Sequence, residues 1–252
     1  MPILTTGAID SHVQLMGEGS PVVLIHGLLL GSLAGWYFHT GPALSPNHRV
    51  ILYDLRGHGR SERLASGYDL VTLAEDLGSV LEATRASGPV DLVGHSYGGL
   101  VALRFALDHP ARVERLVLVD VPLPPSSMSE MKGLEQSGAN GLLEALPSGL
   151  RDAIVGGGRR ARRFLEGIDF LVNRSSLLTD LAAEQDIPDE ALSALECPTL
   201  LVFGQTSSCA AVGDRLAAVL PRARLQTLPG GHFLPMEVPE LLTRAIVEFL
   251  DG

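Results

Sequence analysis

The sequence has few of the residues on which several protein classes depend. Its 252 residues include two cysteines, Cys197 and Cys209, too few for a disulfide scaffold and without the spacing of a metal site. We expect both to be reduced thiols. Lys132 is the only lysine among 19 basic residues, so a lysine Schiff-base mechanism has a single, poorly placed candidate. Because 29 acidic residues give a net charge of −10, a nucleic-acid binder is disfavoured.

Long hydrophobic runs are also missing. No apolar run approaches the ~18–20 residues that cross a bilayer, and the longest candidates, such as 21–25 and 116–119, have the length of strands. The first residues lack the basic start and long apolar stretch of a secretory signal. We therefore expect a cytoplasmic protein without membrane insertion. The 46% of hydrophobic residues is enough for a large core.

Short apolar runs alternate with helix-period segments along the chain. Runs typical of buried strands are 21–26 (PVVLIH), 49–54 (RVILYD), 90–94 (VDLVG), 113–120 (VERLVLVD), 198–204 (PTLLVFG) and 223–228 (ARLQTL). Residues 3–15 predict one or two edge strands. Helix-period segments occupy 69–86, 97–108, 214–219 and 240–250. The alternation predicts an α/β fold with a mostly parallel sheet flanked by helices.

Residues 121–197 interrupt this alternation. The segment opens with Pro122, Pro124 and Pro125, carries three glycines at 156–158, and has helical patches but no convincing strand. It is too long for a plain loop, so we expect a helical cap inserted between core segments 1–120 and 198–252. Its basic run from Arg159 to Arg163 fits a solvated helix face, or a docking patch for an anionic carrier protein or a substrate phosphate.

Residues 94–98 (GHSYG) match the G-x-S-x-G nucleophile elbow in the context that this motif requires. A buried strand leads in, and a helix of small and apolar residues follows. The glycines permit a tight, strained turn that presents the Ser96 hydroxyl at a helix N-terminus, where developing negative charge is favoured. The pattern predicts Ser96 as a nucleophile, against the alternative of a structural turn serine.

Two further motifs follow predicted strands. His26-Gly27-Leu28 lies where such a sheet supplies a second oxyanion donor, so the backbone N–H groups of Leu28 and Tyr97 are the candidate oxyanion hole. We interpret His26 as a packing or loop-fixing residue rather than a base. Residues 54–61 (DLRGHGRS) are interpreted as a turn pinned by arginine and aspartate that shapes the floor of the site.

The candidate base comes late in the chain. His232 lies in 230–233 (GGHF), directly after the last predicted strand. Because the carboxyl ends of parallel strands meet at one edge of a sheet, His232 can reach Ser96 there as a general base. The alternative is a capping or core histidine.

Together these motifs resemble those of the α/β-hydrolase fold superfamily, in its branch of small esterases, lactonases and C–C hydrolases. The resemblance covers nearly the whole chain and rests on residues 26–32 (HGLLLGS), 54–61, 94–99 (GHSYGG) and 231–240 (GHFLPMEVPE). It implies Ser96 as nucleophile, Leu28 and Tyr97 as oxyanion donors, and His232 as base.

The catalytic acid departs from the family pattern. The family usually places an aspartate three residues after the glycine that ends the strand at 198–204, and here that residue is Ser207. Some members carry the acid at the end of the preceding strand instead, where this chain has Asp120. Asp120 is therefore the expected acid. A Ser96–His232 dyad, Asp214 and a carboxylate of the cap stay open as alternatives.

The resemblance implies a serine hydrolase that acts through an acyl-enzyme and needs no metal or cofactor. A carboxylic ester, thioester or lactone of a small apolar substrate fits a pocket lined by Leu29, Trp36, Leu123 and Phe233. Because Ser207 replaces the usual acid, a non-hydrolytic member of the fold (a lyase, a cyclase or a degenerate binding protein) stays open, as does a C–C hydrolase. The sequence also leaves a homodimer open.

Overall fold

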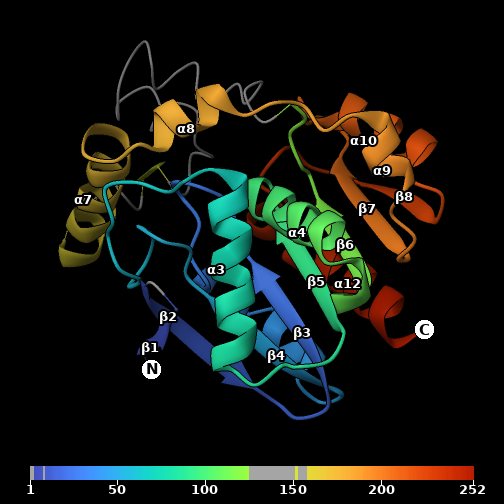
Figure 1. Cartoon of the computed structure of the whole chain (residues 1–252), viewed down its shortest axis with the longest axis horizontal. Helices are drawn as coiled ribbons and strands as arrows, with labels where there is room; N and C mark the ends of the chain where they lie inside the picture. Colours follow the sequence, from blue (N-terminus) through green and yellow to red (C-terminus); the bar gives the residue numbers. More distant parts are fainter. Residues whose placement is uncertain (1–2, 8, 125–150, 153–157) are drawn as a thin grey trace.

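A single sheet forms the centre of the molecule (Figure 1). The computed structural model describes residues 3–7, 9–124, 151–152 and 158–252, with Arg159 and Arg160 represented by their backbone alone. The strands are β1 (Ile3–Thr6), β2 (Ile9–Met16), β3 (Ser20–Ile25), β4 (His48–Tyr53), β5 (Val90–His95), β6 (Val113–Val119), β7 (Thr199–Gly204) and β8 (Ala223–Leu228). All the predicted strands are present.

The strand order is β1-β2-β4-β3-β5-β6-β7-β8. The pairs β1–β2 and β2–β4 are antiparallel, and each pair from β4–β3 onward is parallel. This confirms the predicted mostly parallel sheet. The carboxyl ends of β3, β5, β6, β7 and β8 therefore meet at one edge, where polar side chains from distant parts of the sequence come together.

Helices cover both faces of the sheet. They are α1 (Ala34–Tyr37), α2 (Thr40–Leu44), α3 (Leu70–Ala83), α4 (Tyr97–Asp108), α10 (Ala210–Val219), α11 (Leu234–Glu237) and α12 (Pro239–Asp251), with a short 3₁₀ helix at Pro110–Arg112. Helix α10 begins four residues before the segment predicted from the sequence. The prediction starts late because the first turn of the helix does not alternate between apolar and polar residues at helical spacing. Gly213 there packs its bare backbone on the Phe203 ring.

The parallel strands are buried on both faces, which explains their continuous apolar runs. Successive side chains of a strand point to opposite faces. In β3, Val23 and Ile25 pack in the core that contains α3, α4 and α10, whereas Val22 and Leu24 pack with α1, α2 and α12. Figure 1 shows α3 and α4 in front of the sheet and α12 behind it.

The described part of residues 121–197 is helical. It contains α7 (Arg159–Asn173), α8 (Leu177–Ala183) and α9 (Asp189–Ser193). In Figure 1, α7 and α8 lie beyond the carboxyl ends of the strands. Lys132, Pro125, two glycines of 156–158 and the side chains of Arg159 and Arg160 lie outside the described residues. None of the described helices is long and apolar enough to cross a membrane.

Candidate active site

Ser96 lies at the sharp turn between β5 and α4. Its backbone has φ 53° and ψ −127°, a region that non-glycine residues rarely adopt, and its side chain is only 3% exposed. A β-carbon on Gly94 would collide with the Gly98 carbonyl, and one on Gly98 would collide with the His26 carbonyl. Both positions therefore require glycine. The strand, turn and helix have the geometry of the predicted nucleophile elbow.

Three side chains from the ends of three elements form a hydrogen-bonded chain. His232 Nε2 is 2.9 Å from Ser96 Oγ, and His232 Nδ1 is 2.7 Å from Asp120 Oδ2. Because a carboxylate only accepts, Nδ1 carries the proton and donates to Asp120. Nε2 is then free to accept the Ser96 hydroxyl proton. The arrangement can activate Ser96 as a nucleophile.

Asp120 is held from several directions at the end of β6. Its side chain is 0% exposed, and its backbone has a positive φ of 48°. Oδ1 accepts the Gly204 N–H at 2.8 Å, and Oδ2 accepts both His232 Nδ1–H and the Ser207 hydroxyl, the latter at 2.5 Å. Ser207, which occupies the family's usual acid position, therefore supports Asp120 rather than bonding the histidine. Its own oxygen accepts the Cys209 N–H at 3.0 Å.

The alternative acid Asp214 has no such setting. It lies within α10, and its side chain is exposed. Nδ1 of His232 is bonded to Asp120 instead. Among the candidates that the sequence left open, the geometry favours Asp120.

The loop that carries His232 is fixed by two residues whose roles sequence reasoning missed. The Glu237 carboxylate accepts the N–H groups of Gly231 (2.6 Å) and Phe233 (3.2 Å), one on each side of His232. His95 Nε2–H donates to the His232 carbonyl at 2.7 Å. Burial, with a contribution from nearby His232, lowers the pKa of His95 to about 3, so His95 stays neutral. The only sequence signal was a carboxylate five residues after the histidine.

The candidate oxyanion donors lie on either side of Ser96. Tyr97 is the first residue of α4, where a backbone N–H has no partner within the helix. The loop after β3 passes close to Ser96, because a β-carbon on Gly27 would lie 3.1 Å from Ser96 Cβ. Among the described residues, the N–H groups of Leu28 and Tyr97 donate to no protein acceptor. Both remain available for a developing oxyanion.

The loop that carries Leu28 is held by the motif 54–61. Leu29 has a positive φ of 62°, and its N–H donates to His58 Nε2 at 2.9 Å. Leu33 N–H donates to Asp54 Oδ1 at 2.8 Å. Burial lowers the pKa of His58 to about 3, so this ring stays neutral and can accept from Leu29.

His26 links the same two loops. Its Nδ1–H donates to the Gly27 carbonyl at 2.7 Å, and its Nε2 accepts the Leu55 N–H at 3.0 Å. Burial lowers the pKa of His26 as well. Both ring nitrogens are therefore occupied by backbone, which agrees with the predicted loop-fixing role and not with a base.

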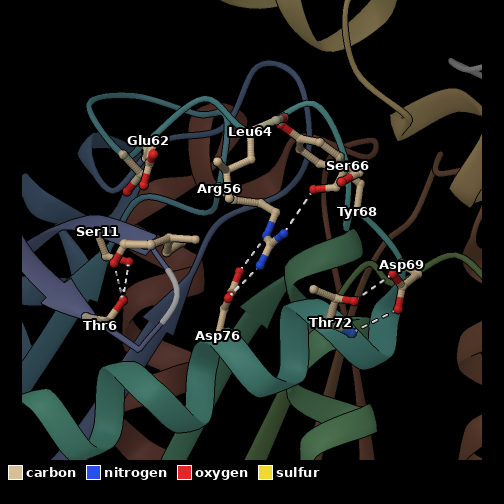
Figure 2. A network of polar contacts seen from close by, with 12 residues as sticks. Thr6, Ser11, Arg56, Glu62, Leu64, Ser66, Tyr68, Asp69, Thr72 and Asp76 are labelled. Carbon is tan, nitrogen blue, oxygen red and sulfur yellow. Dashed lines mark hydrogen bonds and ion pairs between the residues drawn. The ribbon is translucent and has the colours of Figure 1, made fainter.

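Arg56 anchors the motif 54–61 to α3, as Figure 2 shows. Its guanidinium donates to both carboxylate oxygens of Asp76 at 2.7 Å, and a third bond reaches the Ser66 carbonyl at 3.0 Å. Burial raises the pKa of Asp76 even though Arg56 bonds it, so the pair contributes orientation more than stability. This is the arginine-pinned turn that the sequence predicts.

Ser96 and His232 line a cavity of about 290 Å³ whose other walls are mostly apolar. Three of the predicted pocket residues, Leu29, Trp36 and Phe233, line it. Leu123, also predicted for the pocket, is buried at 6% exposure and is not among the described residues that line this cavity.

One group of potential metal ligands occurs among the described residues. Donor atoms of Asp120, Cys209 and His232 lie within 4.8 Å of one another, with Cys209 Sγ 3.9 Å from His232 Nδ1. An ion bound there would have to displace the hydrogen bond between Asp120 and His232. The donor set therefore fits proton transfer better than metal binding.

Comparisons with known proteins agree with this geometry. A family model described as the α/β hydrolase fold matches residues 20–146. A protein of Variovorax paradoxus named as the carbamate hydrolase RutD is 34% identical over 258 aligned positions, covering 95% of each chain. A thermophilic esterase from Thermogutta terrifontis superimposes with a TM-score of 0.81 at 28% identity, covering 99% of this chain and 97% of the esterase.

A second solved structure is Est816, described as an N-acyl homoserine lactone degrading enzyme. It superimposes with a TM-score of 0.77 at 28% identity, covering 98% of this chain and 100% of Est816. These similarities support a hydrolase activity.

Proposed function

Since the chain belongs to the α/β-hydrolase fold family, we propose that it is a serine hydrolase that cleaves a carboxylic ester, thioester or lactone through an acyl-enzyme. One observation carries the proposal. The hydrogen bonds from Ser96 to His232 (2.9 Å) and from His232 to Asp120 (2.7 Å) end on a fully buried carboxylate. That is the geometry by which a serine hydroxyl is activated at neutral pH.

In acylation, Ser96 Oγ forms a bond to the substrate carbonyl carbon while its proton passes to His232 Nε2. The carbonyl oxygen takes the electron pair and rests on the N–H groups of Leu28 and Tyr97. Asp120 stabilises the imidazolium that forms. As the carbonyl re-forms, the bond to the leaving oxygen or sulfur breaks, and His232 donates its proton to that atom.

Deacylation repeats these steps with water. His232 Nε2 accepts a proton from a water molecule as its oxygen attacks the acyl carbon. The bond to Ser96 Oγ then breaks, and His232 returns a proton to that oxygen. The acid product leaves, and Ser96 and His232 regain their starting states. Asp120 remains bonded to Nδ1 throughout, which keeps the ring in the productive orientation.

The cavity beside Ser96 supports a substrate with an apolar part next to its reacting carbonyl, because its walls are mostly apolar and include three leucines, Trp36 and Phe233. The relatives described above are named for the hydrolysis of a carbamate, the cleavage of esters and the degradation of a lactone. Each of these functional groups contains a carbonyl carbon bonded to a heteroatom that can act as the leaving group. The non-hydrolytic alternative rested on the missing acid at Ser207, and the bond from Asp120 to His232 removes that ground.

A fluorophosphonate probe, which reacts with activated serines, tests the proposal. We expect labelling of Ser96 in the wild type, none in Ser96→Ala, and little in His232→Ala. Turnover of a p-nitrophenyl ester by Ser96→Ala should fall on the order of 10⁶-fold. Ser193→Ala, at an exposed serine of α9, is the matched control and should be labelled normally. A folded wild type that is not labelled would overturn the proposal.

A further inference from the structure

A second cavity of about 340 Å³ adjoins the one that contains Ser96. The two share a wall, namely Leu29, Leu30, Gly31, Ser32 and Ala34. The opposite wall of the second cavity is α7, through Arg163, Phe164, Gly167 and Leu171. The two cavities therefore lie next to each other along this loop, and the second one reaches from the loop to α7.

The second cavity is rich in positive charge. Arg60, Arg63 and Arg163 line it, and guanidinium groups stay charged at all ordinary pH values. Within the described residues, the arginines that pair with carboxylates are others, namely Arg56, Arg104, Arg115, Arg174 and Arg215. The carboxylate that lines this cavity, Asp54, already accepts from His12 and from two backbone N–H groups. The cavity therefore offers cations without a matching anion in the described part of the chain.

Arg63 is held in place against α7. Its Cζ lies 5.8 Å from the centre of the Phe170 ring, a cation–π contact. A β-carbon on Gly167 would lie 3.6 Å from Arg63 Nη2, so the missing side chain leaves room for the guanidinium. Arg174 stacks on the same ring at 5.5 Å, but it is paired with Asp169 at 3.0 Å. Of these two arginines, Arg63 is therefore the one that can bind an external anion.

Resting on the proposed function, we propose that the second cavity binds a carboxylate at the end of the substrate remote from the carbonyl that Ser96 attacks. The substrate class is then an ester, thioester or lactone that carries a carboxylate. Its apolar part lies beside Ser96 and its anionic end lies between Arg63 and Arg163. The planar guanidinium fork matches a carboxylate in two parallel hydrogen bonds. A local cluster of this kind also offsets the repulsion that a chain with a net charge of −10 exerts on an anion.

Matched pairs of chromogenic esters test this subsite. The mono-p-nitrophenyl esters of succinate, glutarate and adipate each differ from the butyrate, valerate and hexanoate esters by a terminal carboxylate in place of a methyl group. We expect the wild type to prefer one carboxylated ester over its neutral partner. Arg63→Gln and Arg163→Gln should each raise KM for that ester about tenfold or more, because a charged hydrogen bond is lost. The neutral ester should be unaffected.

Arg174→Gln is the matched control, since it removes a guanidinium from the same ring without touching the cavity. It should leave both esters unchanged. The preference should also fall as salt is raised, because the arginines are exposed. Loss of the preference in Arg174→Gln as well would overturn the assignment to Arg63.

Two results would overturn the subsite and leave the proposed function standing. One is Ser96-dependent hydrolysis of neutral esters with no preference for carboxylated ones. The other is stimulation of neutral-ester turnover by free acetate or phosphate, which would mark a separate anion effector. If no ester is hydrolysed, calorimetry with glutarate decides the subsite independently. Binding weakened at least tenfold in Arg63→Gln supports it, and absence of binding overturns it.

Discussion

The two sides of Ser96 are built in different ways. On one side, the loop after β3 carries the Leu28 N–H and is held by the neighbouring motif 54–61 through bonds to Leu29 and Leu33. On the other side, Asp120 after β6 is held by the N–H of Gly204, the last residue of β7, and by the hydroxyl of Ser207 in the loop that follows. The first side fixes backbone donors, whereas the second fixes the two oxygens of one side chain.

This difference explains why only one side departs from the family pattern. An oxyanion donor is a backbone N–H, so its position depends on the path of the whole loop, and each bond to His58 or Asp54 restrains that path. The acid only has to bring one carboxylate oxygen to His232 Nδ1. Adjacent parallel strands end at the same edge, so either β6 or β7 can supply it. The side that positions one carboxylate tolerates rearrangement, and the side that positions a backbone does not.

Among the changes that test this comparison, removing the acid has the largest expected effect. Asp120→Asn should lower kcat for a p-nitrophenyl ester on the order of 10⁴-fold with little change in KM, because the imidazolium loses its carboxylate. Adding Ser207→Asp to this variant should raise kcat at least tenfold. Ser207 Oγ lies 2.5 Å from Asp120 Oδ2, so a carboxylate at residue 207 can approach His232 in place of Asp120. Asp214→Asn is the control and should be neutral. Full activity in Asp120→Asn, measured on protein with an unchanged circular dichroism spectrum, would remove Asp120 from the triad.

An intermediate effect is expected from the buried histidine of the other side. The pKa of His58 is about 3 in the folded chain, below its unfolded value near 6.5. Between these values the unfolded state binds the additional proton, so folding stability falls as pH falls from about 6.5 to 3. This histidine alone should lower the free energy of unfolding by ~2 kcal/mol when the pH falls from 7 to 5.

His58→Gln tests this pH dependence. Glutamine keeps an acceptor for the Leu29 N–H but does not titrate. Urea unfolding at pH 7 and pH 5 should therefore show a smaller pH-dependent loss in the variant by about that amount. His39→Gln, at an exposed histidine, is the control. An unchanged pH dependence in His58→Gln would show that the pKa of His58 is not lowered in the folded chain.

The smallest effect is expected from Ser207, which supports the acid without contacting substrate. Ser207→Ala removes one hydrogen bond to Asp120 and should lower kcat about tenfold, with KM unchanged. The ascending limb of the pH–rate profile should also move, because the carboxylate that faces His232 loses a donor. Ser208→Ala, at the exposed neighbour, should have no effect. A Ser207→Ala loss as large as that of Asp120→Asn would contradict a supporting role.

The sequence predicts the local motifs and the contacts between strand ends that a parallel sheet brings together, but it does not predict the contacts between loops. The elbow at 94–98 was predictable because its glycines and flanking elements are contiguous, and the whole sheet followed from apolar runs. The contacts of His58 with Leu29 and of Glu237 with the His232 loop depend on how loops meet in space, which no spacing encodes. Proximity to a strand end likewise does not tell which leucines line the cavity, and Leu29 does whereas Leu123 is not among its described lining residues.

The contact between Ser207 and Asp120 has a consequence for how such a site can change over generations. A chain with aspartate at both positions would place two carboxylates about one hydrogen bond apart, and repulsion would keep one of them protonated. The pair would then carry a single charge, which is what the histidine requires. The catalytic acid can thus move from the end of one strand to the end of its neighbour through a chain that has both aspartates, which share one proton. At no stage of such a change does the histidine lack a carboxylate.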